Sequence, residues 1–418
     1  MKIMRIIGNN SLSGTIRVSG AKNSAVALIP AAILANEPVT ICNVPEITDT
    51  DALSEILEYL GATVNRASES IVIDSASIMN KEIPECISKK LRASYYFMGA
   101  LLGKYKHVDM YFPGGCSIGK RPIDLHLKGF ESLGATVTVV GNRYTVAAKE
   151  LKGANIYLDI ASVGATVNIM LAAVLATGTT IIDNAAKEPE IVNVATFLNN
   201  MGAHVTGAGT STIKIVGVNK LHGCFNEVIP DRIEAGTYAI IGALCGDYLK
   251  IDNIIPSHME AITSKFQEMG IPVDIGEDYI LLSKVEEYRP TTIKTSVYPG
   301  FPTDLQQPFT VLLTQCQGNS VVEETIWENR FMHVPNLSKM GASLAVEGNK
   351  VLIKGPSRLI GTTVEATDLR AGAALVAAAL KAEGETVITN VEHILRGYEE
   401  IVEKLTNVGA KIEIEEIN

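Results

Sequence analysis

Apolar positions along this chain follow two spacings that alternate in a regular order. Runs of small apolar residues at helical spacing lead through a glycine or polar turn into short segments of alternating character; the runs include 24–35, 165–176 and 371–381, and the segments that follow them 39–41, 180–182 and 386–388. The first spacing predicts buried helices and the second predicts short strands. The two spacings together predict an α/β protein.

A short motif built around one glycine recurs six times and divides the chain into repeats. The glycines are separated by 73, 68, 68, 71 and 68 residues and are Gly61, Gly134, Gly202, Gly270, Gly341 and Gly409. Each follows a helical pattern and precedes a strand, often with a hairpin, as expected for a glycine that ends a helix in the left-handed conformation. The repeat predicted is helix, strand, helix, strand, strand.

Six repeats of about 70 residues favour two domains of three repeats over one solenoid, because each repeat already carries its own sheet and two helices. The length of 418 residues also exceeds what one hydrophobic core usually covers.

Composition narrows the class of protein. Hydrophobic residues make up 47% of the chain and aromatic residues only 6%, which is typical of helices packed closely on sheets. A net charge of -10 disfavours a general nucleic-acid binder, since such binding needs a basic surface. Any anionic ligand must be held by a local group of arginines and lysines.

The amino terminus turns polar after seven residues, and no apolar run approaches the roughly 20 residues of a membrane span. A cytoplasmic protein without membrane insertion is expected. The six cysteines are scattered without a Cys-x-x-Cys pair, so neither a zinc site nor a redox centre is predicted. Cys245 and Cys316 lie in apolar helical runs and are expected to be buried.

The segment 113–126 concentrates reactive side chains. It places Cys116 among three glycines and just before Lys120 and Arg121, so we expect a shaped surface loop with an exposed thiol. Neighbouring cations favour the thiolate, which suits a nucleophile or a proton donor. The alternative is a basic turn with an incidental cysteine.

Polar residues also recur at two positions in each repeat. The first position precedes each small-residue helix and holds Lys22 with Asn23, Arg92 with Ser94, Ser162, Arg232 with Glu234, Asp304, and Asp368 with Arg370. The second follows the next strand and holds Asp49, Arg121, Glu190, His258, Arg330 and Arg396. Helix capping and solvated loops could explain Ser162 and Asp49. They do not explain cations at helix N-termini, where positive charge is disfavoured, so we favour a site for anions.

Seven segments in order make the chain similar to the enolpyruvyl transferases over its whole length. They are Ser-Gly-Ala-Lys-Asn at 19–23, Pro-Gly-Gly-Cys-Ser-Ile-Gly-Lys-Arg-Pro-Ile-Asp-Leu-His at 113–126, Ser-Val-Gly-Ala-Thr at 162–166, Pro-Asp-Arg-Ile-Glu at 230–234, Phe-Pro-Thr-Asp at 301–304, Glu-Asn-Arg-Phe-Met-His at 328–333 and Thr-Asp-Leu-Arg-Ala at 367–371. The resemblance is greatest to members that use UDP-N-acetylglucosamine as acceptor.

The resemblance implies two inside-out α/β barrel domains of three repeats each, with a ligand cleft between them. One domain would span residues 22–229 and carry the Cys116 loop, and the other would combine residues 1–21 with 230–418. It also implies small-molecule substrates, neither metal nor organic cofactor, and no obligatory protein partner.

The same resemblance implies a reaction and a set of roles. The enolpyruvyl group of phosphoenolpyruvate would pass to the 3'-hydroxyl of UDP-N-acetylglucosamine through a tetrahedral ketal, with release of phosphate, in the first committed step of peptidoglycan synthesis. Cys116 would be the general acid and the target of fosfomycin, and Asp304 the base. Lys22, Arg121 and Arg396 would hold the phosphate. Arg92, Arg330 and Arg370 would meet the carboxylate.

Further contacts to the sugar nucleotide are implied at Asn23, Asp304 and Ile326. Its uracil and phosphate groups would meet Arg121, Pro122, Ile123, Asp124 and Leu125 together with Ser162, Val163 and Gly164. Two other functions remain open. One is the shikimate-pathway enolpyruvyl transfer, whose enzymes lack the cysteine loop, and the other is a catalytically silent regulator that binds a UDP sugar.

Overall fold

The structure is a computed structural model that describes residues 2–67, 69–112 and 123–417. It divides into two compact units. The inserted unit contains residues 20–112 and 123–229, and the split unit contains residues 2–19 together with 230–417. Each unit is described by itself below.

The split unit is built from three repeats and the N-terminal strands. In chain order its elements are β1 (Lys2–Ile7), β2 (Leu12–Arg17), α8 (Arg232–Cys245), β14 (Gly246–Asp252), η3 (Pro256–Met259), α9 (Glu260–Glu268), β15 (Val273–Ile275), β16 (Tyr279–Leu282), β17 (Thr292–Lys294), α10 (Thr303–Leu313), β18 (Gly318–Glu323), α11 (Val334–Lys339), β19 (Ser343–Glu347), β20 (Lys350–Gly355), β21 (Thr363–Glu365), α12 (Leu369–Lys381), β22 (Glu385–Thr389), α13 (Glu392–Leu395), α14 (Ile401–Thr406) and β23 (Lys411–Glu416).

The inserted unit repeats the same order. Its elements are α1 (Lys22–Ala31), η1 (Ala32–Leu34), β3 (Val39–Cys42), α2 (Thr48–Leu60), β4 (Thr63–Ala67), β5 (Ser70–Asp74), α3 (Glu85–Ser88), η2 (Arg92–Tyr95), α4 (Tyr96–Tyr105), β6 (His107–Tyr111), α5 (Asp124–Ser132), β7 (Thr136–Val140), β8 (Arg143–Ala147), β9 (Asn155–Tyr157), α6 (Val163–Ala173), β10 (Thr179–Asp183), α7 (Pro189–Asn200), β11 (His204–Thr206), β12 (Thr212–Val216) and β13 (Phe225–Glu227).

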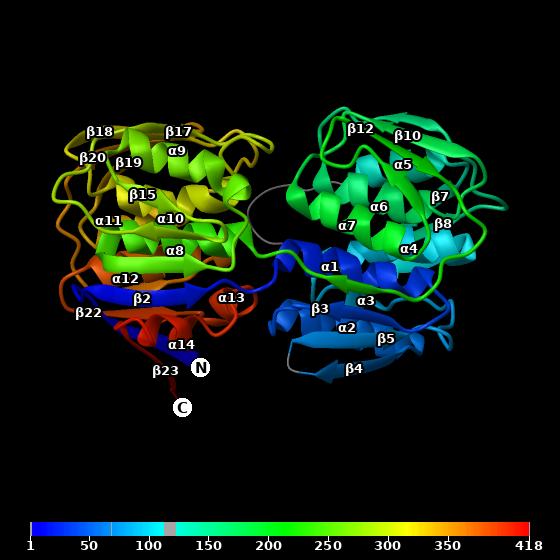
Figure 1. Ribbon diagram of the computed structural model, residues 1–418, viewed down its shortest axis with the longest axis horizontal. Helices are drawn as coiled ribbons and strands as arrows, with labels where there is room; N and C mark the ends of the chain where they lie inside the picture. The colour runs from blue at the N-terminus through cyan, green and yellow to red at the C-terminus, as the bar shows by residue number, and fades with distance from the viewer. Residues whose placement is uncertain (1, 68, 113–122, 418) are drawn as a thin grey trace. The chain divides into compact units, whose positions relative to one another are not determined.

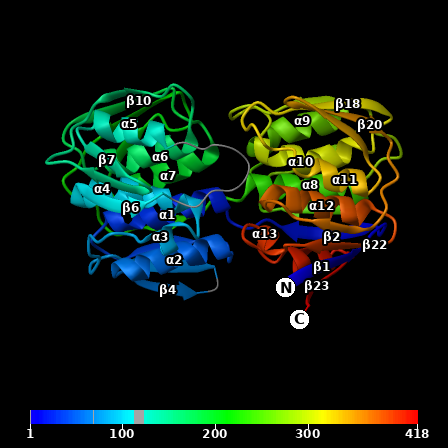
Figure 2. The same cartoon turned by 180° about the vertical axis from the view of Figure 1, so that it is seen from behind.

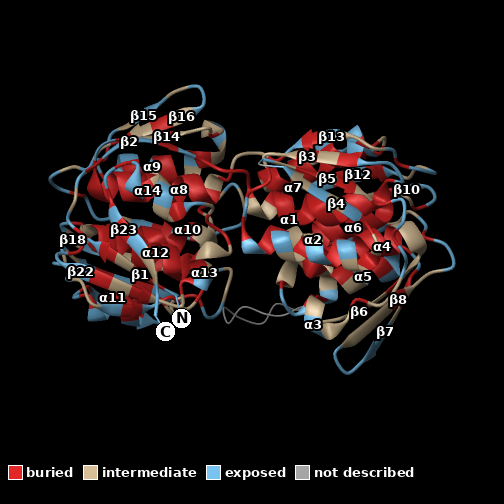
Figure 3. Ribbon diagram, turned by 90° about the horizontal axis from the view of Figure 1, so that it is seen from below, coloured by how far each residue is buried: buried red, intermediate tan, exposed pale blue. Residues whose placement is uncertain are grey.

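The helices rich in small residues form the inside of each unit. In the split unit α8, α10 and α12 pack on one another in pairs, and every residue of α12 from Arg370 to Leu380 is buried. The strands lie at the periphery of the unit (Figures 1 and 2), and buried positions concentrate on the inner helices (Figure 3). The predicted inside-out α/β fold is confirmed. Small side chains suit this position because they let three helices approach closely.

Within the described residues, five of the six sheets have four strands, in which a parallel edge strand is followed by antiparallel partners, as in the order β17-β18-β20-β19. The sheet β6-β8-β7 has three strands, and a single parallel bridge from Ile83 to Met110 occupies the place of the edge strand. The structure has an edge strand before the inner helix, which the predicted repeat of helix, strand, helix, strand, strand did not include. These strands are three to six residues long.

Two edge strands lie in one unit, whereas the inner helix that follows each of them lies in the other unit. β2 precedes α1 of the inserted unit but pairs in parallel with β14 of the split unit. β13 precedes α8 of the split unit but pairs in parallel with β3 of the inserted unit. The chain therefore passes from one unit to the other directly after an edge strand, on both occasions.

The N-terminal strand completes the last repeat. In the sheet β21-β22-β1-β23, β1 pairs antiparallel with both β22 and β23 and takes the place that the second hairpin strand holds in the other sheets. The first and last strands of the chain are thereby joined in one sheet.

All six repeat glycines have positive φ angles, from 79° at Gly270 to 106° at Gly61. An L side chain is strained in this conformation, which explains the glycine at the end of each outer helix and confirms the predicted C-caps.

Cys245 is 5% exposed and Cys316 is fully buried, so the predicted burial is confirmed. This burial raises the pKa of the Cys245 thiol to about 12 and that of Cys316 to about 11. The prediction that Cys316 lies in a helix is wrong, because α10 ends at Leu313. Among the described residues no helix is long and apolar enough to cross a membrane.

The closing strand can be tested with two adjacent isoleucines on opposite faces of β1. Ile6 is fully buried, whereas Ile7 is 48% exposed. Ile6→Ala should lower the free energy of unfolding by about 2–5 kcal/mol because it leaves a cavity in the core, while Ile7→Ala should change it by less than about 0.5 kcal/mol. Urea denaturation measures both. Equal effects would contradict the placement of β1.

Candidate active site

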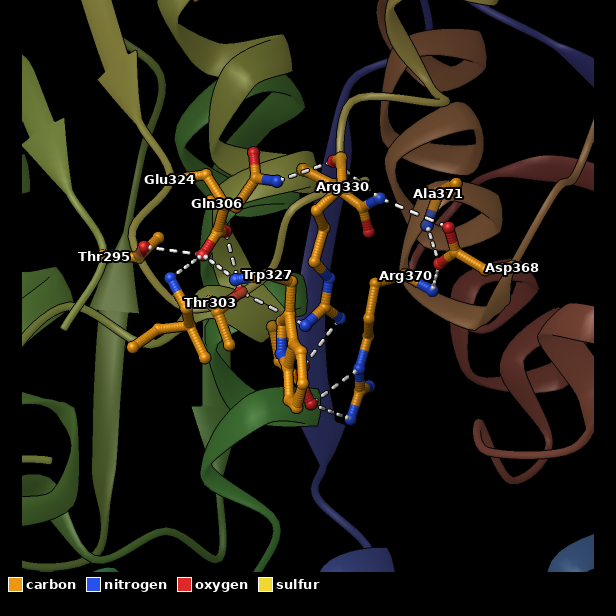
Figure 4. Close-up of polar contacts among 12 residues, drawn as sticks. Thr295, Thr303, Gln306, Glu324, Trp327, Arg330, Asp368, Arg370 and Ala371 are labelled. Carbon is orange, nitrogen blue, oxygen red and sulfur yellow. Dashed lines mark hydrogen bonds and ion pairs between the residues drawn. The ribbon is translucent and has the colours of Figure 1, made fainter. Parts of the chain in front are cut away.

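A carboxylate and two arginines meet at the N-terminal end of α10. Asp304, the second residue of the helix, accepts a hydrogen bond from Arg330 Nη2 at 2.7 Å and another from Arg370 Nε at 3.3 Å. Arg370 Nη2 is a further 3.2 Å from Asp304 Oδ2. Figure 4 shows the two guanidinium groups lying side by side at the end of extended side chains. Side chains from two repeats of the split unit therefore converge on one carboxylate.

The cluster carries an excess of positive charge. The side chains of Arg330 and Arg370 are each only 4% exposed, and that of Asp304 is 26% exposed. Burial lowers the pKa of Arg370, but Tyr398, Asp304 and Asp231 together raise it by more. The pKa of Arg370 therefore lies above its ordinary value. Arginine side chains stay charged in proteins, so both guanidinium groups carry a positive charge. Two buried cations that share one partly exposed carboxylate are suited to bind a small anion bidentately.

The arginines are fixed by their places in the fold. Asp368 caps α12 by accepting hydrogen bonds from the backbone N–H groups of Arg370 and Ala371 at 2.8 and 2.9 Å. This cap places Arg370 in the first turn of the helix. The backbone carbonyl of Arg330 accepts a hydrogen bond from Gln306 Nε2 at 2.9 Å, which ties the segment after β18 to α10.

Glu324 is a structural residue that the sequence analysis missed. This buried carboxylate accepts hydrogen bonds from Thr295 Oγ1 at 2.8 Å, Thr303 Oγ1 at 2.7 Å and the backbone N–H of Ile326 at 2.8 Å. Thr303 in turn accepts from Arg330 Nη1 at 3.1 Å (Figure 4). Glu324 therefore holds the segment that carries Ile326 against the end of α10. One signal was available, since Glu323 and Glu324 are paired acids at the end of a β strand.

In the inserted unit the first and second polar positions of one repeat form an ion pair. Lys22 Nζ, at the start of α1, lies 2.8 Å from Asp49 Oδ2 in the first turn of α2, and both side chains are mostly buried. Asp304 and Arg330 occupy the equivalent positions of another repeat with the charges reversed. In these two repeats the two polar positions contact each other, which the sequence analysis did not foresee.

A neutral histidine lies beside the N-terminus of α6. Asn168 Oδ1 accepts from the backbone N–H of Gly99 at 2.8 Å, so its Nδ2 group donates to His126 Nδ1, also at 2.8 Å. Burial and the nearby Arg92 lower the pKa of His126 to about 3. The ring is neutral and carries its proton on Nε2. A Cβ atom at Gly164 would lie 3.1 Å from that nitrogen, so glycine permits the close approach.

The other predicted site residues lie at or beside helix ends. In the inserted unit Asn23 is the second residue of α1, Arg92 begins η2, and Ser162 caps α6 with its hydroxyl 3.3 Å from Ala165 N. Val163 begins α6, Ile123 is buried, and Asp124 and Leu125 start α5. In the split unit Arg396 follows α13. Cys116, Arg121 and Pro122 lie outside the described residues.

One further histidine is buried beside the arginine cluster. His333 is fully buried, and neither ring nitrogen has a hydrogen-bond partner among the described residues. The pKa of His333 is lowered to about 4, mainly by burial. The positive charge of Arg330 lowers the pKa as well, whereas the negative charge of Asp368 raises it. The ring is therefore neutral in the folded protein.

Comparison with known proteins gives consistent results over nearly the whole chain. The family model for EPSP synthase (3-phosphoshikimate 1-carboxyvinyltransferase) matches residues 6–405. A protein of Geobacillus kaustophilus named UDP-N-acetylglucosamine 1-carboxyvinyltransferase 2 is 56% identical over 412 residues, covering 99% of this chain and 96% of that protein. One of the same name from Bacillus subtilis is 53% identical over 413 residues, with the same coverage.

Two solved structures share the fold. The enolpyruvyl transferase NikO from Streptomyces tendae has a TM-score of 0.90 and 29% identity, and 99% of each chain is covered. EPSP synthase from Acinetobacter baumannii has a TM-score of 0.78 and 17% identity over the full length of both chains. The second likeness concerns the fold alone.

The buried His333 predicts a specific dependence of stability on pH. Its pKa is about 4 when folded and about 6.5 when unfolded, so between these values the unfolded state binds more protons and stability falls as the pH falls. His333→Leu should reduce the slope of unfolding free energy against pH, between pH 5 and 6, by about 1 kcal/mol per unit. Urea denaturation at several pH values measures it. The matched control, His204→Gln, changes an exposed histidine, and a slope that it shares with His333→Leu would contradict the assignment.

Proposed function

This chain belongs to the EPSP synthase family of enolpyruvyl transferases, and from that premise we propose that it is the member acting on UDP-N-acetylglucosamine. The reaction is transfer of the enolpyruvyl group of phosphoenolpyruvate to the 3'-hydroxyl of the sugar, with release of phosphate. The acceptor follows from the relatives named for it, which are 53–56% identical to this chain over nearly its full length.

The observation that carries the proposal is the pairing of two almost fully buried guanidinium groups with the single carboxylate of Asp304. Arg330 also retains a buried Nε–H group without a hydrogen-bond partner among the described residues. Such an arrangement is costly in the absence of a ligand. It suits a substrate that brings a carboxylate or phosphate, and phosphoenolpyruvate has both.

The chemistry has two stages, and its atoms balance. In the addition, the sugar oxygen bonds to C2 of phosphoenolpyruvate, Asp304 takes the hydroxyl proton, and Cys116 delivers a proton to C3. In the elimination, C3 gives a proton back to the Cys116 thiolate, its electron pair forms the C2–C3 double bond of the enol ether, and the bond from C2 to the phosphate oxygen breaks with its electrons leaving on the phosphate. Lys22, Arg121 and Arg396 stabilise the leaving phosphate, and Arg92, Arg330 and Arg370 hold the carboxylate.

Asp304 must change partners to act as the base. Its two oxygens accept hydrogen bonds from Arg330 and Arg370 in the structure. An anionic substrate that takes over these donors would free the carboxylate to accept the hydroxyl proton. Substrate binding and the activation of the base are thereby coupled through the same two arginines.

The remaining contacts to the sugar nucleotide are assigned by the same proposal. They are Asn23, Arg121, Pro122, Ile123, Asp124, Leu125, Ser162, Val163, Gly164, Asp304 and Ile326. The product would enter peptidoglycan synthesis, and so cell shape and division, in the cytoplasm. We further assign Cys116 as the thiol that fosfomycin, a small anionic epoxide, alkylates.

An assay with two acceptors tests the function. With phosphoenolpyruvate and UDP-N-acetylglucosamine, the protein should release phosphate and form a product whose mass equals that of the acceptor plus the enolpyruvyl group. Shikimate 3-phosphate should give neither. Phosphate release and mass spectrometry provide the readouts.

Asp304→Ala serves as the control for that assay. It should lower turnover by at least about a hundredfold, because it removes a group that acts in the transition state.

Two outcomes would contradict the proposal. Product from shikimate 3-phosphate would show that this compound, and not the UDP sugar, is the acceptor. Binding of the UDP sugar without any turnover by the wild-type protein would favour a silent regulator.

A further inference from the structure

Arg370 is held from two sides by different kinds of group. On one side it contacts the Asp304 carboxylate. On the other, Arg370 Nη1 donates a hydrogen bond to Tyr398 Oη at 3.0 Å. Tyr398 follows α13 and is 1% exposed, so its hydroxyl belongs to the interior of the split unit.

The direction of the hydrogen bonds beyond Tyr398 is determined by counting protons. Thr237 Oγ1 lies 2.8 Å from Tyr398 Oη and 2.9 Å from the backbone carbonyl of Ile233. The carbonyl can only accept, so the single hydroxyl proton of Thr237 is committed to it. Tyr398 must then donate to Thr237, and its own oxygen accepts from Arg370. This chain of hydrogen bonds runs from Arg370 to Tyr398, from Tyr398 to Thr237, and from Thr237 to the carbonyl of Ile233.

We infer that Tyr398 and Thr237 are positioning residues that hold the Arg370 guanidinium in place for the carboxylate of phosphoenolpyruvate. The inference rests on the proposed function and adds two residues that touch neither substrate in that proposal. Both hydroxyl groups are fully buried, and each is satisfied by its neighbour in the chain. Their part is to orient Arg370.

The arrangement matters most when Asp304 turns to the acceptor. Arg370 then loses its contact with Asp304 but keeps its hydrogen bond to Tyr398 Oη and the attraction of the nearby Asp231. Because Thr237 lies on α8 and Arg370 on α12, the chain fixes the arginine to an inner helix of another repeat. A guanidinium held this way loses less conformational entropy when it binds the anion.

Isothermal titration with phosphoenolpyruvate, combined with steady-state kinetics, tests the inference. Tyr398→Phe should raise both the Kd and the KM for phosphoenolpyruvate about tenfold, and should leave the KM for UDP-N-acetylglucosamine within about twofold. Thr237→Val, which keeps the shape but removes the hydroxyl, should give the same pattern. Thr237→Ser keeps the hydroxyl and should restore values close to the wild type.

Tyr288→Phe is the matched control for lost stability. Tyr288 is also buried in the split unit, and its hydroxyl donates to the backbone carbonyl of Ala243 at 2.7 Å. This variant should lose comparable stability in urea without a change in either KM. Equal rises of both KM values in Tyr398→Phe, or a wild-type Kd for phosphoenolpyruvate in that variant, would overturn the inference. Absence of product from the wild-type protein would instead overturn the proposed function. The titration would still measure whether Tyr398→Phe weakens the binding of phosphoenolpyruvate, and so would still test the inference.

Discussion

The carboxylate of Asp304 is shared by two guanidinium groups that are almost completely removed from water, and this contact joins two repeats of the split unit. Burying one cation without a partner is costly, and burying two is more so. Asp304 offsets part of this cost for Arg330 and Arg370 together. In the proposed mechanism the remaining positive charge attracts the substrate anion, and the anion in turn frees the carboxylate of Asp304.

The repeat explains how these side chains come together. Polar residues lie at or just before the start of the inner helices, and in two repeats the segment after the next strand returns a second polar residue into contact with the first. Lys22 with Asp49 and Asp304 with Arg330 are two such pairs with opposite arrangements of charge. Three inner helices packed in pairs then bring neighbouring repeats into contact, as Arg370 and Asp304 show. One repeated backbone thus supports different charges at equivalent positions.

Features with a fixed spacing could be predicted from the sequence. The repeat glycines, the inner helices and the polar residues at helix N-termini all recur at about 70 residues, and a local physical rule explains each of them. Asp304, Arg330 and Arg370 were among the residues selected in this way. The resemblance to the enolpyruvyl transferases then supplied the reaction, which spacing alone could not.

The supporting residues could not be predicted, because their partners are distant in the sequence and follow no period. Tyr398 meets Thr237 across 161 residues, and Glu324 meets Thr295 across 29. The edge strands were missed because the predicted repeat has no strand before its inner helix, and most of them are only three residues long. Cys316 was misplaced because its apolar surroundings suggested a longer helix than α10, which ends three residues earlier.

The competition between Asp304 and the substrate anion for the same two arginines is the central claim, and the affinity of the Asp304→Asn variant for phosphoenolpyruvate tests it most directly. Isothermal titration should show binding at least about fivefold tighter than in the wild-type protein, or about 1 kcal/mol, because the amide no longer competes for Arg330 and Arg370. Unchanged or weaker binding would contradict the account, since it would mean that the carboxylate does not oppose the anion.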